Sequence, residues 1–149
     1  MKLVSDITLR WYDESSLEED NPRSLLELLL DSMGITSDVA RDLFHVLLVA
    51  RAEDTALTVK QIRDAIISLR KMRNADKPEK GLTMRNIQVW LQYFREIKLL
   101  DKLGDRYHFR GNRRPSKAFA EGTKPMIEES SRYVERVLKR VEDAYGIKQ

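Results

Sequence analysis

Segment 83–110 limits the possible folds of this 149-residue chain more than any other segment. Residues 83–97 have a helical repeat, because their large apolar side chains fall on one side at about 100° per residue: Ile87, Trp90, Leu91, Phe94 and Ile97. Two short runs of β type follow, 99–103 and 106–110, and Gly104-Asp105 joins them. Glycine at the first central position suits a tight hairpin turn. The segment therefore predicts an amphipathic helix that leads directly into a β-hairpin.

Three more helices are predicted before this segment. The first begins near Asn21, has Pro22 at its first position and ends at Gly34. Its many leucines predict burial on more than one side. The second begins at Thr36 or Ser37, runs to about residue 52 and is the best candidate for a central core helix.

The third helix begins after a minimal strand expected at Ala56-Leu57. Thr58 caps it, and apolar side chains spaced for one buried face continue to Met72. Residues 74–81 then predict a turn, because proline and glycine within them disfavour a helix. Thr83 caps the helix that follows.

The two ends of the chain are less regular. Residues 7–12 alternate between apolar and polar side chains and predict a short strand with one buried face, and 14–20 predict an acidic connector. Residues 111–124 predict an irregular basic loop. A final helix over 125–145 carries an apolar stripe close to a coiled-coil seam: Ile127, Val134, Val137, Leu138, Val141 and Tyr145.

Composition excludes several classes of site. The chain has no cysteine, so disulfides, thiolate zinc sites and cysteine nucleophiles are absent. It has neither the apolar core of a signal peptide nor a run long enough to span a bilayer, and we expect a cytoplasmic protein. His45 fits a core or boundary histidine better than a general base. Without a metal-ligand spacing, a phosphate loop or a nucleophile elbow, we expect no cofactor, no metal and no enzymatic activity.

Charge is distributed unevenly along the chain. Residues 1–57 carry a net charge of −7, residues 58–117 a net charge of +10, and residues 118–149 none. A strongly basic middle segment indicates a polyanionic partner.

Over residues 38–110, the predicted elements follow the order helix, short strand, helix, turn, helix, hairpin. This order resembles that of the winged helix-turn-helix DNA-binding proteins, of the type found among prokaryotic and archaeal transcription regulators. The resemblance implies a mainly α fold with a small β-hairpin wing (α+β). Thr83–Ile97 would be the recognition helix and Leu99–Arg110 the wing. The link of about nine residues before Thr83 is longer than this family usually has.

The resemblance also implies a division of the chain. Residues 1–36 would form an N-terminal arm and apolar helix, residues 37–117 the winged-helix domain, and residues 118–149 a C-terminal helix that can serve as a dimerisation element. The expected assembly is a homodimer through the N-terminal and C-terminal helices.

Arginine, asparagine and glutamine read base edges, while cations and amide donors hold phosphates. Arg85, Gln88 and Gln92 are the expected base-reading residues, and Arg106, Arg110, Arg113 and Arg114 the expected phosphate contacts. The full expected DNA-binding set is Thr83, Arg85, Asn86, Gln88, Gln92, Arg106, His108, Arg110, Arg113, Arg114 and Lys117.

The expected function is sequence-specific binding of double-stranded DNA by a dimeric transcription regulator. Two alternatives stay open. One is a winged-helix protein–protein interaction module in a transcription or replication assembly, in which the basic face meets an acidic partner. The other is binding of single-stranded nucleic acid or RNA, with Tyr93, Tyr107 and Phe109 as stacking platforms.

Overall fold

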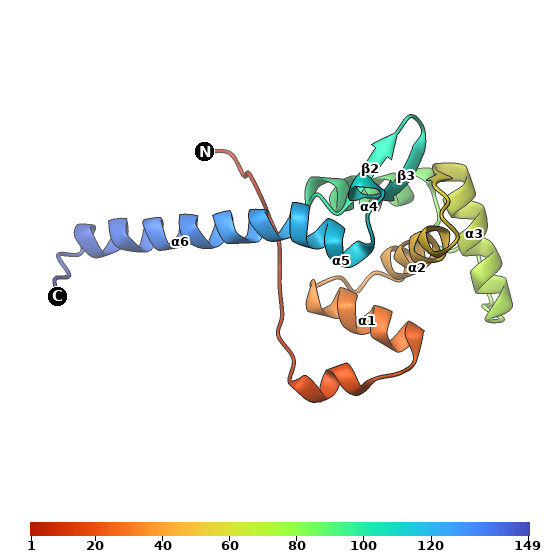
Figure 1. Ribbon diagram of the computed structural model, residues 1–149, viewed down its shortest axis with the longest axis horizontal. Helices are drawn as coiled ribbons and strands as arrows, with labels where there is room; N and C mark the ends of the chain where they lie inside the picture. Colours follow the sequence, from red (N-terminus) through yellow and green to blue (C-terminus); the bar gives the residue numbers. More distant parts are fainter.

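Three helices, α2 (Asp38–Ala52), α3 (Val59–Met72) and α4 (Met84–Glu96), enclose the core of the computed structural model, which describes all 149 residues (Figure 1). Large, fully buried side chains from all three helices meet there: Phe44, Leu43, Leu47, Ile62, Ile66, Ile87, Leu91 and Phe94. The Phe44 ring lies 5.3 Å from that of Phe94 and 5.5 Å from that of Phe109, centroid to centroid. These contacts fix α4 relative to the hairpin that follows it.

The sheet has three antiparallel strands, β1 (Leu57–Thr58), β2 (Leu100–Leu103) and β3 (Arg106–Phe109), in the order β1-β3-β2. Strands β2 and β3 are joined at Gly104-Asp105, where Gly104 has φ +63°, a conformation that glycine adopts without steric cost. The α+β class and the hairpin predicted from the sequence are confirmed. Strand β1 lies one residue later than expected.

The helix starts follow the predicted caps. Asn21 caps α1 (Pro22–Ser32), Ser37 caps α2, Thr83 caps α4, and Thr58 forms a reciprocal capping box with Gln61 at α3. Helix α1 buries Leu26 and Leu30 but leaves Leu25 and Leu29 exposed. The expectation that α1 is buried on more than one side is therefore wrong, since only α2 covers it extensively.

The N-terminal strand predicted at residues 7–12 is absent. This segment is extended, and its backbone donates one hydrogen bond, from Arg10 N–H to the Ser32 carbonyl oxygen at 2.7 Å. Ile7 packs on the core, but Trp11 is 94% exposed. The alternating pattern produces no strand because no neighbouring strand pairs with it. A 3₁₀ turn, η1 (Glu14–Glu18), replaces the expected connector.

The irregular loop predicted at residues 111–124 is largely helical. After the short turn η2 (Arg110–Asn112), helix α5 (Pro115–Ala118) continues through a single π turn, η3 (Phe119–Thr123), into α6 (Lys124–Ala144). A Cβ atom on Gly122 would lie 2.2 Å from the Lys98 carbonyl oxygen. This glycine therefore permits a close approach of the π turn to the end of α4, and it does not break the helix.

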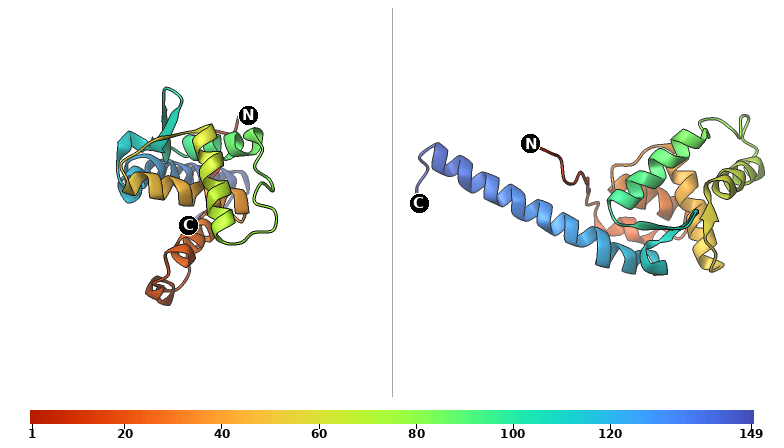
Figure 2. Two further views of the ribbon diagram at one scale, coloured as in Figure 1. Left: turned by 90° about the vertical axis from the view of Figure 1, so that its right-hand side faces the viewer. Right: turned by 90° about the horizontal axis from the view of Figure 1, so that it is seen from above.

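Helix α6 projects away from the rest of the molecule as a single rod (Figures 1 and 2). None of its residues is buried. None of the helices combines the length and the apolar character that crossing a membrane would require.

Candidate nucleic-acid interface

The outer face of α4 presents side chains that no other part of the chain engages. The side-chain hydrogen bonds of this helix involve Asn86, Gln92, Arg95 and Glu96. Arg85 and Gln88 are exposed and make none, and Val89, one turn after Arg85, is 56% exposed. The helix therefore offers a free guanidinium, a free amide and a small apolar side chain on one surface.

Other predicted residues of α4 have structural partners. The Thr83 hydroxyl accepts a hydrogen bond from the Asn86 backbone N–H at 3.1 Å, and the Asn86 side-chain amide donates to the Gly81 carbonyl oxygen at 3.0 Å. The Gln92 amide donates to Glu96 and accepts from Arg95, both at 3.3 Å. Thr83 and Asn86 thus fix the start of α4, which leaves Arg85 and Gln88 as its unengaged polar side chains.

The long turn between α3 and α4 is held from within the chain. Arg70 donates through Nη1 to the carbonyl oxygens of Pro78 at 3.1 Å and of Lys80 at 2.6 Å. Arg63 donates through Nε to the Leu82 carbonyl oxygen at 2.9 Å. The turn is therefore tied to α3 along its second half, and this fixes the direction in which α4 begins.

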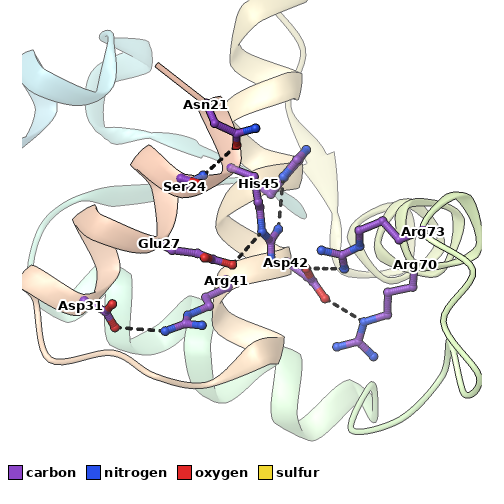
Figure 3. A network of polar contacts seen from close by, with 10 residues as sticks. Asn21, Ser24, Glu27, Asp31, Arg41, Asp42, His45, Arg70 and Arg73 are labelled. Carbon is purple, nitrogen blue, oxygen red and sulfur yellow. Dashed lines mark hydrogen bonds and ion pairs between the residues drawn. The ribbon is translucent and has the colours of Figure 1, made fainter. Parts of the chain in front are cut away.

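Arg70 is placed by a buried carboxylate, Asp42 of α2 (Figure 3). Its Nε donates to one carboxylate oxygen of Asp42 at 2.7 Å, while Arg73 and Arg23 donate to the other oxygen at 2.8 and 2.9 Å. Burial by itself raises the pKa of the Asp42 carboxyl, but the three arginine hydrogen bonds outweigh it and hold that pKa below its usual value. Asp42 therefore joins α1, α2 and α3 through one ionised group.

His45 lies beside this cluster, with Nδ1 3.2 Å from Nη1 of Arg23 (Figure 3). Burial lowers the pKa of His45, and the charges of Arg23 and Arg73 lower it further, while Asp42 opposes them. A neutral imidazole can accept the Arg23 hydrogen bond. The interpretation of His45 as a hydrogen-bonded boundary histidine is confirmed.

Three lysines outside the predicted DNA-binding set line a shallow hollow between the end of α3 and the turn that follows it: Lys71, Lys77 and Lys80, together with Pro78 and Glu79. None of these lysines has an ion pair within the chain. In the sequence, proline and glycine mark this segment as a turn, and the recurrence of cations between residues 71 and 80 is the signal that indicates these lysines.

The cations of the hairpin are mostly engaged. Arg106 donates through Nη1 to the Ala56 carbonyl oxygen at 3.0 Å, so it fastens β3 to the residue before β1. His108 is half-buried, with Nδ1 2.8 Å from the Phe109 carbonyl oxygen. The Lys102 ammonium lies 5.6 Å from the centre of the Tyr107 ring. Arg106 and His108 thus stabilise the sheet and are less available than expected.

The basic segment after the hairpin converges on Glu121. Arg110 donates to the Glu121 carbonyl oxygen at 3.1 Å, and the Glu121 carboxylate lies 3.6 Å from Nε of Arg113 and 3.9 Å from Nζ of Lys117. Arg114 is exposed and has no ion pair. Figure 2 shows this segment and α4 on opposite sides of the hairpin in both views. The predicted residues therefore form two groups, one on each side.

The three aromatic rings that were expected to stack on bases are buried or half-buried. Tyr107 is 6% exposed and Phe109 is 1% exposed, so no base can reach their rings. Tyr93 is half-buried, and its pKa is raised by burial and by the charge of Asp6. Base stacking on Tyr107 and Phe109 is therefore not available in this conformation.

Comparison with known proteins gives no match to any family model, curated protein or solved structure. The chain also has no group of three or more histidine, aspartate or glutamate side chains placed to hold a metal ion.

Proposed function

We propose that this chain is a winged-helix protein that binds double-stranded DNA in a sequence-specific way, as a transcription regulator of prokaryotic or archaeal type and not as an enzyme. One observation carries the proposal. The unengaged Arg85 and Gln88 of α4 lie directly after a turn that is held in place by Arg70 and presents two free lysines, Lys77 and Lys80, with Lys71 at the end of α3 beside them. This is the combination of base-reading and phosphate-binding groups that a helix in the major groove needs.

Each group has a distinct role in this proposal. Arg85 is suited to the two acceptors of a guanine edge, Gln88 to an adenine edge, and Val89 to a thymine methyl group. Lys77 and Lys80 neutralise phosphates beside the start of α4. Thr83 and Asn86 set the helix start, and Arg114 is the free cation across the hairpin.

A homodimer completes the proposal. The exposed side of α1, with Leu25 and Leu29, and the C-terminal helix α6 offer apolar surface for a second copy. Two-fold symmetry would then match two α4 helices to the half-sites of a palindromic DNA site.

Titration with random and selected duplexes at about 50 and 200 mM salt tests the proposal. We expect the double substitution Lys77→Gln/Lys80→Gln to weaken all duplexes alike and to reduce the slope of log K against log salt by about 2. Lys124→Gln/Lys139→Gln removes two charges near or on α6 and serves as the matched control. Absence of binding at about 50 mM salt would refute the proposal, because phosphate contacts alone give measurable affinity.

Gln88→Ala tests specificity separately. We expect it to reduce discrimination at one base pair by about 1–3 kcal/mol while leaving random DNA unaffected. Equal losses on selected and random duplexes would remove Gln88 from the base-reading set.

A second candidate function is recognition of an acidic protein segment by the same face. It is favoured by two exposed apolar side chains of α4, the helix that follows the lysine-bearing turn: Met84 and Val89. Binding of an acidic amphipathic peptide by a chain that fails to bind duplex DNA would favour this candidate.

A further inference from the structure

Helix α6 exposes an apolar stripe that nothing in the chain covers. Its exposed members are Tyr133, Val134, Val137, Leu138, Val141 and Tyr145. The 21-residue helix would be about 31 Å long, and it extends away from the body in Figure 1 and in the right-hand view of Figure 2. A helix without tertiary packing is marginal in water, and a monomer rarely exposes so continuous an apolar surface. We therefore expect a partner surface to cover this stripe.

The stripe has an acidic edge and a mainly basic edge. At 100° per residue, Glu128, Glu135 and Glu142 recur every seven residues along one side of it, and Arg136 and Arg140 lie along the other. Glu135, Glu142 and the two arginines have no ion pair within the chain. Glu129 also lies toward the basic edge, but Arg132 of the next turn neutralises it. Each copy thus leaves opposite charges unpaired on opposite edges.

We propose that α6 pairs with α6 of a second copy of this chain, parallel and in register. In a parallel pair, the acidic edge of each helix faces the basic edge of the other, whereas an antiparallel pair would place like edges together. Ile127, Val134 and Val141 repeat at one core position, and β-branched residues there favour two strands. This refines the proposed homodimer and does not depend on DNA binding.

The absence of cysteine permits a direct test of orientation. In the full chain, Val141→Cys introduces a single thiol at the repeated core position of α6. In a parallel pair the two thiols lie across from each other, and we expect mild oxidation to convert most of the protein to a covalent dimer. Lys139→Cys, on the polar side of the helix, is the matched control and should cross-link slowly.

Charge reversal tests the edges. Glu135→Arg/Glu142→Arg and Arg136→Glu/Arg140→Glu should each raise the dimer dissociation constant at least about tenfold by repulsion between like edges. An equimolar mixture should form heterodimers in sedimentation or light-scattering measurements. Because α6 lies outside the core, circular dichroism should confirm a folded body in each variant.

Three results would overturn the inference. One is a wild-type chain that stays monomeric at about 100 µM. Another is preferential cross-linking between Ile127→Cys and Val141→Cys chains, which indicates an antiparallel pair. The third is unchanged dimerisation of both charge variants. DNA titration of the same proteins reports on the proposed function separately, so the two proposals can fail independently.

Discussion

Helix α4 buries its apolar face inside the chain, whereas α6 turns an apolar face to solvent. Ile87, Leu91 and Phe94 of α4 are fully enclosed by α2, α3 and the hairpin, and no residue of α6 is buried. Both helices show the same kind of amphipathic sequence. An amphipathic pattern therefore predicts that one face will be covered, but it does not show whether the covering surface belongs to the same molecule.

The polar sides of the two helices differ as well. The outer face of α4 leaves Arg85 and Gln88 unengaged next to the lysines of the preceding turn. Helix α6 instead separates its charges into an acidic edge and a basic edge. The arrangement on α4 suits binding to a polyanion, and the arrangement on α6 suits pairing with α6 of a second copy of the chain.

The largest effect is expected from removing the carboxylate that places the start of α4. Asp42→Ala would leave Arg23, Arg70 and Arg73 without their shared counterion, and we expect it to lower the free energy of unfolding by about 3–5 kcal/mol. Asp31→Ala, which removes the partly exposed partner of Arg41, is the control and should cost about 1 kcal/mol or less. Urea denaturation measures both, and similar losses would contradict the assignment.

The same carboxylate predicts an acid transition. Folding lowers the pKa of Asp42, so its stabilising contribution is present above pH 4 or so and is lost as the pH falls through the lower pKa of the folded state. Asp42→Asn should therefore lose less stability than the wild type between about pH 4 and pH 2. If the free energies of unfolding of the wild type and of Asp42→Asn fell in parallel between these pH values, the prediction would be wrong.

A matched pair of truncations tests the comparison of the two helices directly. Leu91→Ala in α4 should cost about 2–5 kcal/mol at any protein concentration. Leu138→Ala in α6 should change the stability of the monomeric body by no more than about 0.5 kcal/mol and weaken self-association instead. Denaturation at two protein concentrations separates these effects, and a large concentration-independent loss for Leu138→Ala would show that α6 packs on its own body.

The junction between the two regions gives a smaller effect. Gly122→Ala places a Cβ atom 2.2 Å from the Lys98 carbonyl oxygen, and we expect a loss of about 1–3 kcal/mol from the forced shift of the π turn. Ala120→Gly, an exposed change in the same turn, controls for backbone flexibility. An unchanged free energy of unfolding for Gly122→Ala would mean that the π turn can move to accommodate the Cβ atom.

The smallest effect concerns His45. Folding lowers its pKa, so the folded state binds fewer protons, and the free energy of unfolding should rise with pH up to about 6.5. His45→Gln should flatten this dependence between about pH 5 and pH 7, and His108→Gln controls for the loss of a histidine. Chemical denaturation at several pH values measures this dependence. If the slope of the free energy of unfolding against pH is the same in His45→Gln as in the wild type, the lowered pKa of His45 is contradicted.

Sequence patterns predicted the local structure well where local chemistry decides it. The caps at Asn21, Ser37, Thr58 and Thr83 and the turn at Gly104 were found from residue type alone. The irregular loop predicted at residues 111–124 was wrong, because the helical path there depends on the close approach of Gly122 to the Lys98 carbonyl oxygen, which is distant in sequence.

The candidate site was predictable only in part. Sequence places Arg70 and Lys77 in the same basic segment, but one turns inward to Asp42 and backbone carbonyls while the other stays free. Tertiary contacts decide which cations are engaged within the chain and which stay free to contact a ligand. The predicted DNA-binding set therefore overestimated the number of free cations around residues 106–117 and left out the lysines of the turn before α4, although the +10 charge of residues 58–117 includes them.

The uninterrupted helical path from Pro115 to Ala144 has a mechanical consequence. A flexible linker at residues 111–124 would let two bodies joined at their C-terminal ends sample many separations. Because α5, the π turn and α6 form one rod that Gly122 seats against the end of α4, body and rod turn together. Two such bodies would then be held at one spacing, and they would tolerate little variation in the distance between the two surfaces that they contact.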